Sequence, residues 1–189
     1  MEIVQNFDNT VLEFIRIHMS SGFLDFIMPL ITKLGTGGMI WIVVALAFLK
    51  SKQYRTDGLI LIGSLLLCVL LGNIILKPLI GRIRPCDINT AIPLLIARPT
   101  DFSFPSGHTL SSFAAASVIF HANTGMGIAA IVLASLIAFS RLYLYVHYPS
   151  DILAGMILGI FIGAAVIWFF KVKEGLANNP VREGGILKN

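Results

Sequence analysis

Two nineteen-residue runs of this chain, Gly58–Leu76 and Ile152–Phe170, contain no charged side chain. The least apolar members of the first run are Ser64, Asn73 and Cys68. A helix needs about 20 mainly apolar residues to cross the hydrocarbon core of a bilayer. Only 13% of the 189 residues are charged, which is about half the share found in a soluble domain. The fold class is therefore predicted to be all-α, a polytopic transmembrane helical bundle.

Five crossings are predicted, over residues 34–50, 58–76, 106–122, 125–143 and 151–170. Residues 22–33 are apolar but contain Asp25 and Pro29 and are too few to span alone, so a short tilted or interfacial helix is expected there.

Nearer the start, apolar residues recur at helical spacing, which is typical of an amphipathic helix in the membrane interface. These residues are Val4, Phe7, Val11, Phe14 and Ile15. The same segment contains the acidic residues Glu2, Asp8 and Glu13. A secretory signal would begin with basic residues, so these acidic residues argue against one.

The expected organisation has three parts. Interfacial helices occupy residues 1–33, a transmembrane domain occupies 34–171 with its motif core at 55–170, and a short polar tail occupies 172–189. The net charge of +4 is small, and the basic residues cluster at membrane ends, so no nucleic-acid partner is expected. Neither cysteine has a partner at zinc-binding spacing.

Eleven residues at three separated places form a candidate phosphate-handling set: Lys77-x6-Arg84-Pro85, Pro105-Ser106-Gly107-His108 and Ser140-Arg141-x5-His147-x3-Asp151. Each motif falls at the end of a predicted crossing. Because successive crossings alternate in direction, all three motifs are predicted to reach the same side of the membrane. The predicted convergence of three separately spaced motifs supports a single site.

Lys77, Arg84 and Arg141 would place three cations on that one side. Ionisable groups at membrane depth are costly and usually serve a function. Converging cations repel each other unless an anion neutralises them, and phosphate or pyrophosphate suits the planar arginine forks. A single lysine or arginine here could instead reach toward the membrane surface from a helix end, but three together favour a phosphate site.

The remaining motif residues suggest nucleophilic catalysis. Pro105-Ser106-Gly107-His108 resembles a helix start, whose free amides attract an anion and to which Ser106 adds a hydroxyl. The four-residue spacing can bring the Asp151 carboxylate to one nitrogen of His147, leaving the other free to attack phosphorus. His108 can then protonate the departing oxygen. Two histidines and an aspartate could also bind a divalent ion, but the cations would repel it, so no metal and no cofactor are expected.

The motifs, written here as KPLIGRIRP, PSGH and SRLYLYVHYPSD, resemble those of the type 2 phosphatidic acid phosphatase family, which shares its core with vanadium haloperoxidases. The resemblance covers about residues 55–170 and all eleven positions. It implies an integral-membrane, metal-independent lipid phosphatase with a phosphohistidine intermediate. His147 would be the nucleophile, Asp151 would orient it and His108 would be the general acid. Lys77, Arg84, Ser106, Gly107 and Arg141 would hold the phosphoryl oxygens.

The expected partners are membrane lipids and a lipid phosphate or pyrophosphate substrate. The resemblance favours undecaprenyl pyrophosphate, converted to undecaprenyl phosphate, with phosphatidylglycerol phosphate or phosphatidate as alternatives. A transporter that binds anions without catalysis is the alternative of another class, and a haloperoxidase is a third. The loop from Cys86 to Phe104 is expected to be a lid, a lipid contact or ordinary interfacial packing.

Two further expectations concern the whole molecule. The side opposite the motifs carries lysines and arginines at positions 50, 52, 55, 171, 173, 182 and 188. Under the positive-inside rule, that side is expected to be cytoplasmic. The active site of this plasma-membrane protein is therefore expected to face outward. Gly155, Gly159 and Gly163 form a stripe of small residues, which is interpreted as close packing within the monomer, with a homodimer seam as the alternative.

Overall fold

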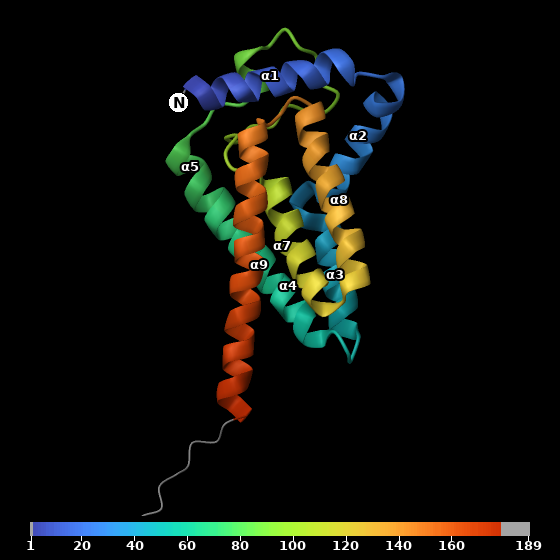
Figure 1. The fold of residues 1–189 in the computed structure, drawn as a ribbon, viewed down its shortest axis with the longest axis vertical. Helices are drawn as coiled ribbons and strands as arrows, with labels where there is room; N and C mark the ends of the chain where they lie inside the picture. Colours follow the sequence, from blue (N-terminus) through green and yellow to red (C-terminus); the bar gives the residue numbers. More distant parts are fainter. Residues whose placement is uncertain (1, 179–189) are drawn as a thin grey trace, which may run out of the picture.

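The computed structural model describes residues 2–178, which form a bundle of long helices capped by one helix that lies across it (Figure 1). The capping helix is α1 (Glu2–His18). It buries Leu12 and Ile15 toward the protein and exposes Val4, Phe7 and Phe14. This two-sided pattern agrees with the predicted amphipathic helix.

The first crossing is longer than predicted. α2 (Gly22–Gly35) and α3 (Met39–Lys50) are joined by the 3-10 turn η1 (Thr36–Gly38), and together they form a 29-residue segment apolar enough to span. Residues 22–33 are therefore continuous with this candidate span, and the expected boundary at residue 34 falls inside it. Asp25 is accommodated because Tyr143 donates a 2.5 Å hydrogen bond to its carboxylate.

The second crossing runs through α4 (Arg55–Cys68), the π-helical stretch η2 (Val69–Leu76) and α5 (Lys77–Ile80). A short helix, α6 (Pro85–Ile88), follows. By length and composition, four helical segments of the described chain are candidate spans: Gly22–Lys50, Arg55–Ile88, Thr124–Tyr143 and Pro149–Lys173. The last two correspond to α8 (Thr124–Tyr143) and to most of α9 (Pro149–Asn178). Because α9 continues to Asn178, the expected tail begins within it, and residues 179–189 lie outside the described residues.

The remaining predicted crossing is α7 (Gly107–Ala122), which has only 16 residues and is about 24 Å long at 1.5 Å per residue. It packs mainly against α8 and α9 in the middle of the bundle. In Figure 1 it begins below the level at which α8 ends and α9 begins. The start of α7 is therefore recessed among longer helices, and this recess holds the motif residues.

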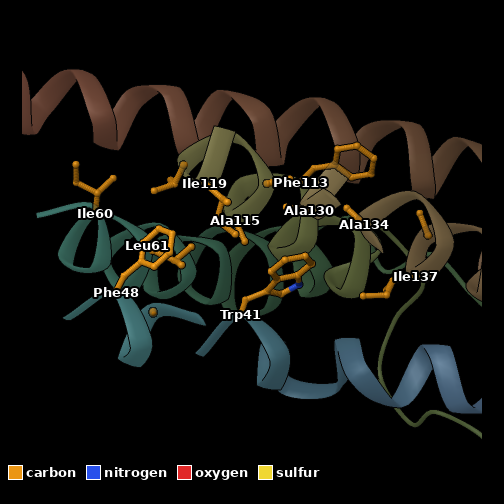
Figure 2. Close-up of a cluster of buried hydrophobic side chains, with 14 residues drawn as sticks. Trp41, Phe48, Ile60, Leu61, Phe113, Ala115, Ile119, Ala130, Ala134 and Ile137 are labelled. Carbon is orange, nitrogen blue, oxygen red and sulfur yellow. The ribbon is translucent and has the colours of Figure 1, made fainter. Parts of the chain in front are cut away.

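The core lies where α3, α4, α7 and α8 meet (Figure 2). Trp41 is 1% exposed there and donates a 2.9 Å hydrogen bond to Ser112. The outer surface is apolar, with Leu66, Phe161 and Trp168 each about two-thirds exposed. Apolar residues on the outside and small or polar residues inside are what a lipid environment favours.

The glycine stripe of α9 packs against α7 within the same chain. A Cβ atom on Gly155, Gly159 or Gly163 would lie 2.4–2.9 Å from a backbone oxygen of the α7 segment. These three glycines therefore permit close contact between the two helices, as the interpretation of packing within the monomer predicts. A homodimer stays a prediction.

Candidate active site

A cavity of about 480 Å³ opens at the motif end of the bundle. Six of the eight predicted site residues line it: Lys77, Arg84, Gly107, His108, Arg141 and His147. The other two, Ser106 and Asp151, are fully buried beside it. The structure thus brings together the residues of all three motifs, as the alternation of crossings predicts.

The first motif enters the cavity through a sharp turn. Lys77 begins α5, and Gly81 ends that helix with a positive φ of 61°. A left-handed residue at a helix end suits glycine, which has no Cβ to clash. The chain then runs on through Arg82 and Arg84 to α6. Arg84 is only 2% exposed, and its guanidinium reaches across to the loop that precedes α9.

A carboxylate from the loop before α7 lies on two of the cations. Asp101 pairs with Lys77, and its other oxygen accepts a 2.7 Å hydrogen bond from Arg84 Nη2. The Asp101 side chain is about half exposed. Partial burial raises the pKa of this carboxyl, but the hydrogen bond from Lys77 and the charges of Lys77 and Arg84 outweigh that effect and lower it to about 2. The cations are therefore partly neutralised by the protein itself.

His147 is held with its Nε2 atom against Arg84. The turn after α8 contains Tyr145, a bulky residue at φ 59°, and it directs both the Val146 carbonyl and His147 toward Arg84. Arg84 Nη1 lies 2.6 Å from that carbonyl and 3.0 Å from His147 Nε2. Because a guanidinium can only donate, Nε2 must be the acceptor and the proton must sit on Nδ1. The lone pair that a nucleophile needs is thus on the nitrogen that faces Arg84.

The ring of His147 is electrically neutral at ordinary pH. It is 1% exposed. Burial lowers the pKa of the imidazole, Asp151 opposes that shift, and the positive charges of Arg84 and Arg141 reinforce it, so that the pKa falls to about 3. A neutral imidazole is the form that can attack phosphorus.

The predicted contact between His147 and Asp151 involves a third residue. Nδ1 of His147 lies 3.6 Å from Asp151 Oδ2, which is longer than a normal hydrogen bond. The Ser103 hydroxyl donates to that same carboxylate oxygen at 2.6 Å and lies 3.4 Å from Nδ1. Ser103 therefore links the imidazole to the carboxylate, a role that the motif spacing did not reveal.

Asp151 is fixed through both of its oxygens. The Tyr148 backbone amide donates to Oδ2 at 2.9 Å, and Arg82 Nη1 donates to Oδ1 at 2.6 Å. Arg82 is a residue of the first motif segment that sequence analysis did not assign to the site. It also holds the Ser103 segment, because the Ser103 amide donates to the Arg82 carbonyl at 2.8 Å.

The start of α7 places His108 on the wall of the cavity. Ser106 is the residue before the helix, and its hydroxyl accepts a 3.0 Å hydrogen bond from Thr109. His108 Nε2 lies 3.5 Å from the hydroxyl of Thr36, in the turn between α2 and α3. At Gly107, an added Cβ would lie 3.1 Å from the Asn73 side-chain oxygen. Glycine thus permits the close approach of α7 to η2.

Arg141 reaches the cavity from the end of α8. It is 4% exposed, and its Nη1 donates to the Thr32 hydroxyl at 2.7 Å. Its Nε is a buried donor that has no hydrogen-bond partner among residues 2–178. Buried donors are nearly always satisfied, so this nitrogen lacks a partner that a buried donor usually has. In the same described range, no group of three or more His, Cys, Asp or Glu residues could hold a metal ion.

Three residues near the site escaped sequence analysis. Arg82 lies inside the KPLIGRIRP motif and Ser103 lies two residues before PSGH, so their closeness to the motifs was an available signal. Asp101 is a single acidic residue in a loop, and no spacing marks it. Its loop was expected to be a lid, a lipid contact or packing, and the structure shows that it also supplies polar groups to the site.

Comparison with known proteins decides the family. Residues 57–174, well over half of the chain, match the model of the PAP2 superfamily. The chain belongs to the PAP2 superfamily. The matched range agrees closely with the motif core predicted at 55–170, and the family assignment agrees with the resemblance seen in the motifs.

Three similar proteins are informative. An undecaprenyl-diphosphatase of Sulfolobus acidocaldarius is 34% identical over 140 residues, which cover 74% of this chain and 67% of that protein. A decaprenylphosphoryl-5-phosphoribose phosphatase of Mycobacterium tuberculosis is 34% identical over 126 residues, which cover 67% and 69% of the two chains. The crystal structure of a transmembrane PAP2-type phosphatidylglycerolphosphate phosphatase from Bacillus subtilis superposes with a TM-score of 0.75. It is 26% identical, and the match covers 91% of this chain and 88% of that one. This PAP2 chain is thus a multi-pass membrane protein.

Proposed function

We propose that this chain removes the terminal phosphate from a lipid pyrophosphate, with undecaprenyl pyrophosphate as the preferred substrate, through a phosphohistidine at His147. As a member of the PAP2 superfamily, it is an integral-membrane phosphatase. The observation that carries the proposal is a cavity lined by three cations and by the buried His147, whose unprotonated Nε2 faces Arg84. That arrangement matches an anionic phosphoryl group and a nitrogen nucleophile at once.

The first chemical step transfers the phosphoryl group to the protein. The His147 Nε2 lone pair attacks the terminal phosphorus while Arg84 turns from that nitrogen to a phosphoryl oxygen. The bridging P–O bond breaks, and the leaving lipid phosphate takes a proton from His108, which is protonated once the negative charge of the bound phosphate offsets the surrounding cations. Ser103 and Asp151 stabilise the charge that develops on the imidazole ring.

The second step regenerates the enzyme. His108, now unprotonated, accepts a proton from water as the water oxygen attacks the phosphorus on His147. The N–P bond breaks, and inorganic phosphate leaves. Lys77, Arg84 and Arg141 would stabilise the phosphoryl charge in both steps, and Ser106 and the Gly107 amide would assist them. Fixed cations thus perform the charge neutralisation that a metal ion performs in other phosphatases.

The identity of the lipid rests on the names of the relatives. The relatives from Sulfolobus and Mycobacterium act on isoprenoid phosphates, whereas the solved Bacillus protein acts on phosphatidylglycerol phosphate. The basic residues on the opposite side favour a plasma-membrane protein with its site facing outward. An outward site suits the recycling of an isoprenoid carrier, with phosphatidylglycerol phosphate and phosphatidate as the alternative substrates.

The test measures phosphate release by the purified protein in detergent. Undecaprenyl pyrophosphate, phosphatidylglycerol phosphate and phosphatidate are supplied separately, each with excess chelator. We expect turnover of at least the first lipid in chelator and a labelled phosphohistidine when the terminal phosphate is radioactive. His147→Asn should abolish both signals.

His121→Asn is the matched control, because His121 is exposed at the far end of α7. It should turn over like the natural chain. Loss of activity in chelator, or turnover by His147→Asn, contradicts the mechanism. A preference for phosphatidylglycerol phosphate would leave the mechanism intact and change the substrate.

A further inference from the structure

Asp8 is a fully buried carboxylate on a helix whose other charged residues are exposed. Its exposed fraction is 0%, whereas Glu2, Glu13 and Arg16 of α1 are all exposed. Removing a carboxylate from water costs several kcal/mol unless partners compensate for the lost hydration. The position of Asp8 therefore requires specific partners.

All three hydrogen bonds that Asp8 accepts come from the catalytic end of the bundle. The Ser150 backbone amide donates at 2.9 Å, the Ser150 hydroxyl at 2.6 Å and Arg82 Nη2 at 2.6 Å. Ser150 is the residue just before Asp151. Asp8 and Ser150 are 142 residues apart in the sequence, so these contacts fasten the capping helix directly to the start of α9.

Arg82 joins two buried carboxylates with one guanidinium. Its Nη2 binds Asp8, and its Nη1 donates at 2.6 Å to Asp151 Oδ1. Its guanidinium carbon also lies 4.1 Å from the centre of the Tyr148 ring. A planar guanidinium held at one edge by Asp8 presents its other edge to Asp151 in a fixed direction.

This direction matters because a carboxylate can rotate about its Cβ–Cγ bond. Oδ2 of Asp151 faces Ser103 and the His147 ring, and Oδ1 is held by Arg82. If Arg82 turned away, Oδ1 would lose its charged donor and the plane of the carboxylate would no longer be fixed. The Ser103 hydroxyl and the Nδ1 proton of His147 would then lose their alignment.

We propose that Asp8 and Arg82 are positioning residues for the His147–Asp151 pair. Through Asp8, α1 thus helps to orient the catalytic residues. Neither residue lines the phosphate cavity, and both act through Asp151. The inference rests on the proposed function, because it assumes that His147 is the nucleophile. It predicts a defect in the chemical step without a defect in substrate binding.

The first experiment compares kcat and KM for phosphate release from the lipid on which the natural chain is most active. Asp8→Asn keeps the shape of the side chain but removes the charge that holds Arg82. We expect kcat to fall about tenfold, as is common when a supporting contact behind a site is lost, with KM unchanged. If kcat and kcat/KM fall by the same factor, the lost interaction is one that is made only in the transition state. Glu13→Gln, which neutralises an exposed carboxylate of the same helix, should leave kcat unchanged.

The second experiment is a double-mutant cycle that separates positioning from general stability. If Asp8 acts through Arg82, adding Asp8→Asn to Arg82→Gln should lower kcat little beyond the loss caused by Arg82→Gln alone. Losses that multiply, or a lowered melting temperature with kcat unchanged, would overturn the proposal. Should Asp8→Asn fail to accumulate in membranes, Ser150→Ala carries the test. It removes the 2.6 Å hydrogen bond to Asp8 and also the 2.7 Å hydrogen bond that Arg82 Nη1 donates to the Ser150 hydroxyl, and it must lower kcat while KM holds.

The two proposals fail in different ways. An inactive natural chain, or an active His147→Asn variant, defeats the proposed function. The inference alone is defeated when the natural chain is active, His147→Asn is inactive and Asp8→Asn turns over at the natural rate.

Discussion

The Asp101 carboxylate pairs with two cations for which the sequence suggests only a substrate phosphate as partner. The side chains of Lys77 and Arg84 need an anion, and the structure supplies one from the loop before α7. Because Asp101 is about half exposed, it can leave the cations without a large burial cost. A phosphoryl group that enters the cavity must therefore compete with this carboxylate for the same two cations.

Asp101→Asn should consequently strengthen the binding of inorganic phosphate. The competing interaction is partly screened by solvent, so we expect an effect of about 1 kcal/mol, or roughly fivefold. The measurement is the inhibition constant of inorganic phosphate in the lipid phosphatase assay. Asp87→Asn is the control, because Asp87 pairs with Arg98 at 2.8 Å and does not line the cavity. Weaker inhibition in Asp101→Asn would mean that the carboxylate holds the cations in place for phosphate.

At the scale of helices, the sequence was most informative where charge is absent. The two uncharged runs locate the second and fifth crossings, because lipid excludes charge along a whole span. The first crossing was predicted too short because Asp25 and Pro29 suggested an interface. The structure places Asp25 against the Tyr143 hydroxyl and Pro29 inside α2. Such a partner 118 residues away could not be inferred from local sequence.

The contact between α7 and α9 gives a prediction at the same scale. A Cβ on Gly159 would lie 2.4 Å from the Leu110 carbonyl oxygen and 3.0 Å from the Ala114 nitrogen, so Gly159→Ala must push two backbones apart. Overpacking of this kind costs about 1–3 kcal/mol, which lowers the melting temperature of a chain this size by roughly 2–12 °C. Thermal unfolding in detergent measures the loss.

Gly63→Ala is the matched control for this change. Its added Cβ would meet Val166 at an ordinary 3.5 Å, and alanine favours a helix over glycine. Gly63→Ala should therefore keep or slightly raise the melting temperature. If Gly159→Ala instead altered the oligomeric mass and left the melting temperature unchanged, the stripe would be a dimer seam.

For the molecule as a whole, the alternation of crossings predicted that three distant motifs share one site, and the cavity brings them together. The recessed start of α7 cannot be predicted from the sequence. The spacing of apolar residues indicates that a helix forms, but not how deep its first residue lies among the neighbouring helices. The contact between α1 and the Ser150 segment was equally hidden. In the sequence Asp8 is one of several charged residues along an amphipathic segment, and only the tertiary fold shows that it is buried.

The side of the membrane on which this cavity opens is the prediction that belongs to the whole molecule. The loop that precedes α7 lies at the cavity end of the bundle, whereas the turn between α3 and α4 lies at the opposite end (Figure 1). Thr90 and Lys52 are exposed residues of these two segments, and both natural cysteines are buried. Single cysteines at these positions should therefore react with a membrane-impermeant maleimide above a low background. If the cavity faces outward, Thr90→Cys is labelled in intact cells and Lys52→Cys only after permeabilisation. The reverse pattern would place the site on the cytoplasmic side, where an outer-leaflet carrier lipid could not be its substrate.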